Sequence, residues 1–169
     1  MRKSAIVAIV LAAALTLGGC ASHPGAAAVV DGRTISTSTV DRATRELNEL
    51  FTVDPRGVLT MLIVAPVYLD EASGLGIGKS REEARDYLAD VAQVNELDLD
   101  LDTVSDATLD ILAFDMAVQE MRLLIDTEDL GERLRTRIDA LDVEVNPRFG
   151  SFEGSVVSAT TPEWIVQAP

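Results

Sequence analysis

Cysteine and histidine are the scarcest reactive residues of this 169-residue chain, and each occurs only once, as Cys20 and His23. A single cysteine cannot form a disulfide within the chain. The single histidine precedes the first strand-like segment, and we interpret it as solvated. Because the sequence also lacks an acid/base pair, a metal-ligand cluster and a nucleophile constellation, it predicts a protein that is not an enzyme and needs no cofactor.

Basic residues are also few, with 14 Lys and Arg against 28 Asp and Glu, which gives a net charge of −14. Residues 1–19 contain Arg2 and Lys3 and no acid, so the charge becomes −16 without them. A domain this acidic repels nucleic acid and anionic lipid headgroups. We therefore expect no nucleic acid and no nucleotide among its partners.

Two segments resemble ligand-binding loops without matching them. Residues 73–80, SGLGIGKS, would need glycine at Ser73 to match the Walker phosphate loop. An EF-hand loop that starts at Asp98 would need glycine at Thr103 and glutamate at Leu109. We interpret the first segment as a helix end and turn, and residues 95–102 as a solvated acidic linker anchored by leucines. Calcium binding by this linker is the alternative.

The N-terminus has the pattern of a bacterial lipoprotein signal. Arg2 and Lys3 precede an apolar run over residues 5–17, and the sequence LGGC at 17–20 resembles a lipobox. This pattern predicts a signal peptide over residues 1–19, lipid attachment at Cys20 and a tether over residues 20–25. The chain would then be extracytoplasmic and held on the bacterial cell membrane by lipid. An ordinary secretory peptide with an incidental cysteine is the alternative.

The remaining sequence predicts a mainly helical domain. Asp31-Gly32 is typical of the two-residue turn of a hairpin, here between apolar residues 27–30 and residues 34–35. Ser38 and Asp41 then resemble a capping box at the start of the first helix. Apolar periodicity and capping signals predict helices over residues 37–51, 57–72, 81–97, 106–125 and 128–141, and alternation predicts a strand over residues 143–145. Asp54-Pro55 marks the start of the second helix, and Ser80 with Glu83 forms a capping box at the third.

Apolar residues also indicate which faces are buried. The helix over 57–72 is apolar nearly all round, so we expect it at the centre of the fold and too short to cross a membrane; a strand over 62–69 is the alternative. Burial is expected for Tyr87 and Val94 on the third helix and for Leu123 on the fourth. The fifth helix gathers three arginines, which we expect to pair with local acids, with a recognition patch as the alternative: Arg133, Arg135 and Arg137.

Two motifs at opposite ends of this region resemble one known family. The sequence AAVVDGRTIS at 27–36, together with VEVNPRFG at 143–150, is similar to the N-terminal domain of the SurA/PrsA family of extracytoplasmic chaperones. The resemblance covers residues 26–153 and implies an orthogonal domain of about five helices, closed by a small sheet in which the N-terminal strand pairs with a C-terminal one. Family members also carry a parvulin isomerase domain, for which this chain leaves no room. Residues 154–169 would be a strap pinned by Trp164 and Ile165, or a free tail.

The resemblance implies a chaperone-like, non-catalytic domain that binds unfolded or translocated polypeptides of the cell envelope. Methionine and tyrosine side chains adapt to varied partners, so the candidate contacts are Met61, Tyr68, Met116 and Met121. Core packing is the alternative for each of them. The competing functions are an adaptor lipoprotein that docks one specific envelope protein and, third, an enzyme.

Overall fold

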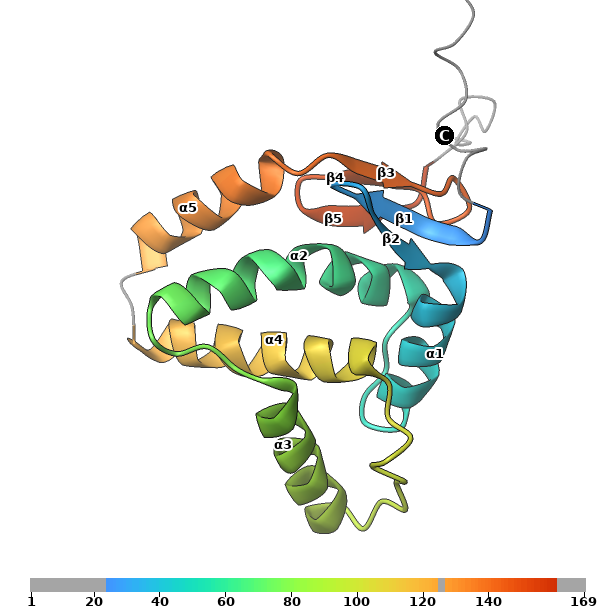
Figure 1. Cartoon of the computed structure of the whole chain (residues 1–169), viewed down its shortest axis with the longest axis vertical. Helices are drawn as coiled ribbons and strands as arrows, with labels where there is room; N and C mark the ends of the chain where they lie inside the picture. Colours follow the sequence, from blue (N-terminus) through green and yellow to red (C-terminus); the bar gives the residue numbers. More distant parts are fainter. Residues whose placement is uncertain (1–23, 125–126, 161–169) are drawn as a thin grey trace, which may run out of the picture.

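The computed structural model describes residues 24–124 and 127–160, which form a mainly helical domain with small antiparallel sheets (Figure 1). This confirms the predicted mainly helical class. The elements, in chain order, are β1 (Ala26–Val30), β2 (Arg33–Ser36), α1 (Thr37–Asn48), α2 (Pro55–Gly74), α3 (Arg81–Val94), α4 (Asp106–Leu124), α5 (Thr127–Asp139), β3 (Val143–Val145), β4 (Ser151–Glu153) and β5 (Val156–Ser158).

The first hairpin forms as predicted. Asp31 and Gly32 both have positive φ, 49° and 78°, which matches the twist of the flanking strands. The first helix begins at Thr37, as predicted, but the capping pair of Ser38 with Asp41 was wrong. Ser36, not Ser38, caps α1, because its side chain accepts a hydrogen bond of 3.0 Å from the backbone N–H of Thr39.

The prediction that the first strand pairs with residues 143–145 is confirmed. β3 lies antiparallel beside β1, with Val145 opposite Ala28, and the strand order is β2-β1-β3. Beyond the ladder, the backbone N–H of Asp142 donates to the carboxylate of Asp31 at 2.9 Å. The sheet therefore joins the two ends of the helical segment.

Helix α2 is the central helix. It begins with Asp54 as N-cap and Pro55 at its first turn, as predicted, and it packs against α1, α4, α5, β1 and β5. The strand alternative for residues 62–69 was wrong. Among the described residues α2 is the one helix long and apolar enough to cross a membrane, contrary to the expected shortness. Eight of its 20 residues are buried in the fold, which is typical of a core helix.

A second hairpin follows the predicted closing strand. β4 pairs with β5, and the buried Val157 donates its backbone N–H to the hydroxyl of Thr60 on α2 at 2.9 Å. Residues 156–158, at the start of the segment predicted as a strap or a free tail, therefore pack against the helical body. Strands of three residues each, joined at Gly154, gave too weak an alternation to reveal this hairpin. Trp164 and Ile165 lie outside the described residues.

The expected burial of three apolar side chains was wrong. Tyr87 is 40% exposed, Val94 80% and Leu123 84%. Helix α3 projects from the body of the molecule (Figure 1), and its principal packing partner is α4. Only one face of α3, formed by Ala84, Leu88 and Ala92, is therefore covered.

Candidate functional site

The four predicted contact residues are largely packed into the fold. Met121 is 3% exposed, while Met61, Tyr68 and Met116 are half-buried against the core. The rings of Tyr68 and Phe114 make an edge-to-face contact with centroids 5.0 Å apart. Each side chain thus contributes to the packing between helices.

Two of these four residues meet in a groove between α2, α4 and α5. Tyr68 and Met121 line it together with Leu130 and Leu134 of α5, and its volume is about 150 Å³. Met61 and Met116 do not line this groove. Its volume is below the range of about 300 to 1,000 Å³ that is usual for ligand sites.

A larger hollow lies between α1, α3 and the start of α4, and we call it the acidic cleft. Its volume is about 350 Å³, within the range of ligand sites. Among residues 24–124 and 127–160, no lysine or arginine lines it. Four carboxylates, four apolar side chains and two threonines do: Glu46, Glu49, Asp98, Asp100, Leu50, Leu88, Leu99, Val104, Thr103 and Thr108.

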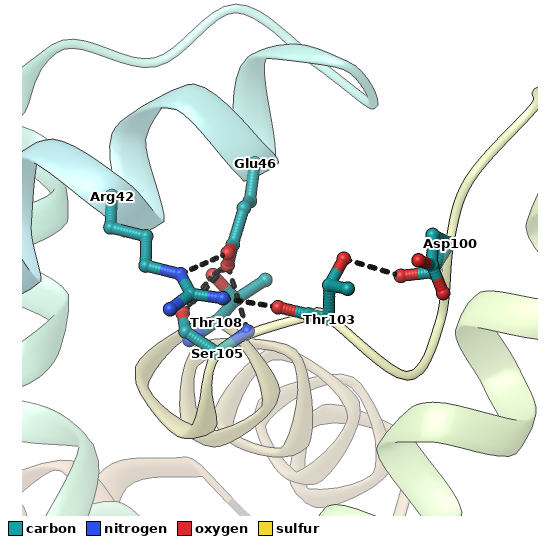
Figure 2. A network of polar contacts seen from close by, with 6 residues as sticks. All are labelled: Arg42, Glu46, Asp100, Thr103, Ser105 and Thr108. Atoms are coloured by element: carbon teal, nitrogen blue, oxygen red, sulfur yellow. Dashed lines mark hydrogen bonds and ion pairs between the residues drawn. The ribbon is translucent and has the colours of Figure 1, made fainter.

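Glu46 builds one wall of the acidic cleft by joining α1 to the N-terminus of α4 (Figure 2). Its carboxylate accepts hydrogen bonds from the Ser105 backbone N–H at 3.1 Å, the Ser105 hydroxyl at 2.6 Å and the Thr108 hydroxyl at 2.5 Å. Arg42 donates to the other oxygen at 2.7 Å. The carboxylate also lies at the positive end of the α4 dipole, which stabilises its charge.

These contacts set the protonation of Glu46. Burial raises the pKa of its carboxyl group, but the hydrogen bonds from Ser105, Thr108 and Arg42 together outweigh burial and lower the pKa below the ordinary glutamate value. Glu46 is therefore a fixed anion at neutral pH. Because its oxygens are already occupied, it serves the cleft as a structural wall.

The linker between α3 and α4 forms the outer edge of the cleft. Leu99 and Leu101 pack against the core while Asp98, Asp100 and Asp102 are exposed, which confirms the predicted acidic linker with leucine anchors. The turn is held by Thr103, whose hydroxyl donates to the Asp100 carbonyl at 2.9 Å. The guanidinium of Arg42 donates to the Thr103 carbonyl (Figure 2).

Sequence reasoning did not identify the acidic cleft. It placed Glu46 and Glu49 on an outward face of the first helix and treated Asp98 and Asp100 as solvated. The only available signal was the alternation of leucine and aspartate over residues 97–102, which indicates an edge that is half packed and half exposed. The end of α1 and this linker lie close together in space but about 50 residues apart in the sequence. No local sequence pattern predicts such a contact.

Two further features test chemical alternatives. Within residues 24–124 and 127–160, no group of three or more His, Cys, Asp or Glu side chains is placed to hold a metal ion.

On α5, Arg133 and Arg137 form ion pairs with Glu71 of α2 at 2.9 and 3.1 Å. The expected pairing with local acids is confirmed for these two arginines.

No family model, curated protein or solved structure matches this chain. Resemblance to the SurA/PrsA family thus continues to rest on the two motifs alone. Cys20 and His23 lie outside the described residues.

Proposed function

We propose that this chain is a lipid-anchored, extracytoplasmic, non-catalytic protein that binds unfolded or translocated polypeptide segments in a chaperone-like way. The observation that carries the proposal is the acidic cleft, an open hollow with an apolar floor at the projecting end of the domain. A segment of extended or unfolded chain offers the apolar side chains that such a floor accommodates. The SurA/PrsA-like motifs support the same class of function.

The arrangement of the elements also supports this proposal. The floor combines Leu50 of the turn after α1, Leu88 of α3 and Leu99 of the linker, so it depends on the orientation of the projecting helix α3. Arg81, at the start of α3, holds that orientation through a two-point contact with Asp110 of α4, at 2.6 and 2.8 Å. The hollow is thus built into the fold before any partner binds, which lowers the cost of binding.

An aggregation assay tests the proposed function. The full-length chain should suppress light scattering by a thermally unfolded client enzyme at near-stoichiometric ratios. Leu99→Ser, on the floor of the acidic cleft, should remove most of this suppression. Leu75→Ser is the matched control, because Leu75 is exposed and does not line the cleft. Absence of suppression by the unmodified chain would overturn the proposal.

The second candidate is an adaptor lipoprotein that docks one specific envelope protein. It is favoured by the outward stripe on α3, where Tyr87 and Val94 are exposed seven residues apart and so share one face of the helix. A fixed apolar stripe on one helix suits a single complementary partner. Recovery of one stoichiometric partner from envelope extracts, together with no suppression of aggregation, would favour this candidate.

A further inference from the structure

The rim of the acidic cleft carries negative charge that the fold itself leaves uncompensated. Glu49, Asp98 and Asp100 are exposed, and no ion pair among the described residues involves any of the three. Glu46 differs from them, because Arg42 and the α4 N-terminus already satisfy it. Three exposed carboxylates without an ion pair therefore line the cleft, although that of Asp100 accepts a hydrogen bond of 3.2 Å from the Asp102 backbone N–H.

The leucines that form the apolar floor of the cleft are less exposed than these carboxylates, since Leu88 is buried and Leu50 and Leu99 are half-buried. Leu50, Leu88 and Leu99 contribute to it from three separate parts of the chain. A ligand that fills the cleft must bury apolar groups against these leucines and simultaneously displace water from the rim carboxylates. Carboxylates that lose water without gaining a partner are strongly unfavourable.

We infer that the acidic cleft takes a cationic amphipathic polypeptide segment, whose apolar side chains meet the leucine floor while flanking lysines or arginines pair with Glu49, Asp98 and Asp100. The inference rests on the proposed polypeptide-binding function and specifies its substrate class. Charge complementarity supports it, since no lysine or arginine of the part of the chain that the structure describes lines the cleft, and the whole chain carries a net charge of −14.

Other occupants fit the cleft less well. A neutral apolar segment would desolvate the rim without replacing its lost hydration, and an acidic segment would meet like charge on every side. A metal ion lacks a suitable site, because no group of three acidic, histidine or cysteine side chains among the described residues is placed to ligate one.

The position of the cleft suits this role. Helix α3 and the linker over residues 98–104 lie at the end of the molecule opposite the strands, whereas residue 24 leads into β1 (Figure 1). If Cys20 is lipidated as proposed, the tether attaches at the strand end. The acidic cleft then faces away from the membrane and stays open to a segment that approaches from solution.

Fluorescence anisotropy with three labelled peptides tests the inference on the full-length chain. The peptides share the same leucine positions, and their remaining positions are lysine, glutamate or serine. The lysine peptide should bind about tenfold or more tightly than the serine peptide, because its lysines can form three exposed ion pairs with the rim carboxylates, and the glutamate peptide should not bind. Added salt should weaken the lysine peptide most.

Two matched triple variants separate the cleft from the general charge of the protein. The rim variant carries Glu49→Gln, Asp98→Asn and Asp100→Asn. The control carries three exposed changes of α5 and β3 with the same effect on net charge: Glu132→Gln, Asp139→Asn and Glu144→Gln. The rim variant should lose the preference for lysine while the control retains it. Thermal melts verify that both variants fold.

Each outcome decides one question. Equal loss in both triple variants would show that the peptide senses only net charge, which would overturn the inference. Equal binding of all three peptides would overturn the inference and leave the proposed function standing. Absence of binding by any peptide, together with no suppression of client aggregation, would overturn both.

Discussion

The side-chain amide of Asn146 donates a hydrogen bond of 2.9 Å to the carbonyl oxygen of Ala26, 120 residues earlier in the chain. The backbone N–H of Asn146 donates to the neighbouring carbonyl of Ala27, also at 2.9 Å. The Asn146 side-chain oxygen accepts from the backbone N–H of Arg148 at 3.1 Å. One side chain thus closes the sheet and begins the turn that leads to the buried Phe149.

Replacement of Asn146 tests this closure. Asn146→Ala removes two side-chain hydrogen bonds at a half-buried site, and we expect a loss of about 1 to 2 kcal/mol in the free energy of unfolding. Denaturant titration measures it. Asn95→Ala is the control, because the Asn95 amide donates only to Val91 within the same turn and is exposed. Equal effects of the two changes would contradict a closing role for Asn146.

Gly150 is the last residue of the VEVNPRFG motif that contains Asn146. Only glycine fits there, because the backbone of Ser158 passes very close to its Cα atom. Its φ is +118°, and a Cβ atom there would lie 1.8 Å from the carbonyl oxygen of Ser158. Gly150→Ala should therefore cost at least about 2 kcal/mol of stability, or separate the β4–β5 hairpin from α2.

The matched control for that change is Gly131→Ala on α5. A Cβ at Gly131 meets nothing within 4 Å, and the residue is in the interior of a helix. We expect this variant to be neutral or more stable by up to about 1 kcal/mol. Chemical unfolding of both variants measures the contrast, and similar destabilisation by the two would refute the steric argument.

Helix α3 offers a test of the corrected burial pattern. Leu88 is almost fully buried, so Leu88→Ala should cost about 2 to 4 kcal/mol. Val94 is 80% exposed, so Val94→Ala should change stability by less than about 0.5 kcal/mol. Thermal melts distinguish the two. A large loss on truncation of Val94 would restore the buried stripe that the sequence pattern predicted.

Local chemistry allowed the helices and turns to be predicted from the sequence. Asp31-Gly32, Asp54-Pro55 and the Ser80–Glu83 capping box each act within four residues, and all three form as expected. Apolar periodicity was less informative on α3, because it shows which residues are apolar and not how many neighbouring elements cover them. Tyr87 and Val94 are exposed for that reason.

The candidate site was largely beyond sequence reasoning. Its rim brings Glu49, the C-cap of α1, near Asp98 and Asp100 of the linker, and its floor depends on the angle of α3. Such proximity arises from tertiary packing between segments distant in the chain. Selecting methionine and tyrosine by their adaptability identified Tyr68 and Met121 in a shared groove, but that chemistry serves the core equally well.

Removal of Cys20 tests the proposed anchor. Lipid attachment requires the thiol, so Cys20→Ser should move the chain from the membrane fraction to the soluble fraction when it is expressed in a bacterium. Fractionation followed by immunoblotting measures the shift, and labelling with a fatty-acid analogue should disappear with it. His23→Ser, three residues away, is the control and should remain in the membrane fraction. A membrane-bound Cys20→Ser variant would contradict lipid anchoring through this residue.

Glu46 makes the stability of the helix junction dependent on pH. The pKa of its carboxyl group lies below the ordinary value in the folded protein, because hydrogen bonds from Ser105, Thr108 and Arg42 outweigh the burial that raises it. A group with a lowered folded pKa stabilises the fold fully above its unfolded pKa, and this contribution is lost as the pH falls through the folded pKa. Glu46→Gln removes the titration, so the variant should be less stable by about 1 to 2 kcal/mol at about pH 7, and this difference should shrink as the pH falls through the folded pKa of Glu46.

Urea unfolding across that pH range measures the difference between the two chains. Glu49→Gln is the control, because Glu49 is exposed just after the end of α1 and should change stability by less than about 0.5 kcal/mol at neutral and at low pH. If Glu46→Gln costs as much at low pH as at neutral pH, the loss comes from altered packing. A cost confined to pH values above the folded pKa of Glu46 identifies its charge, held by the N-terminus of α4, as the interaction that joins α1 to α4 and shapes the wall of the acidic cleft.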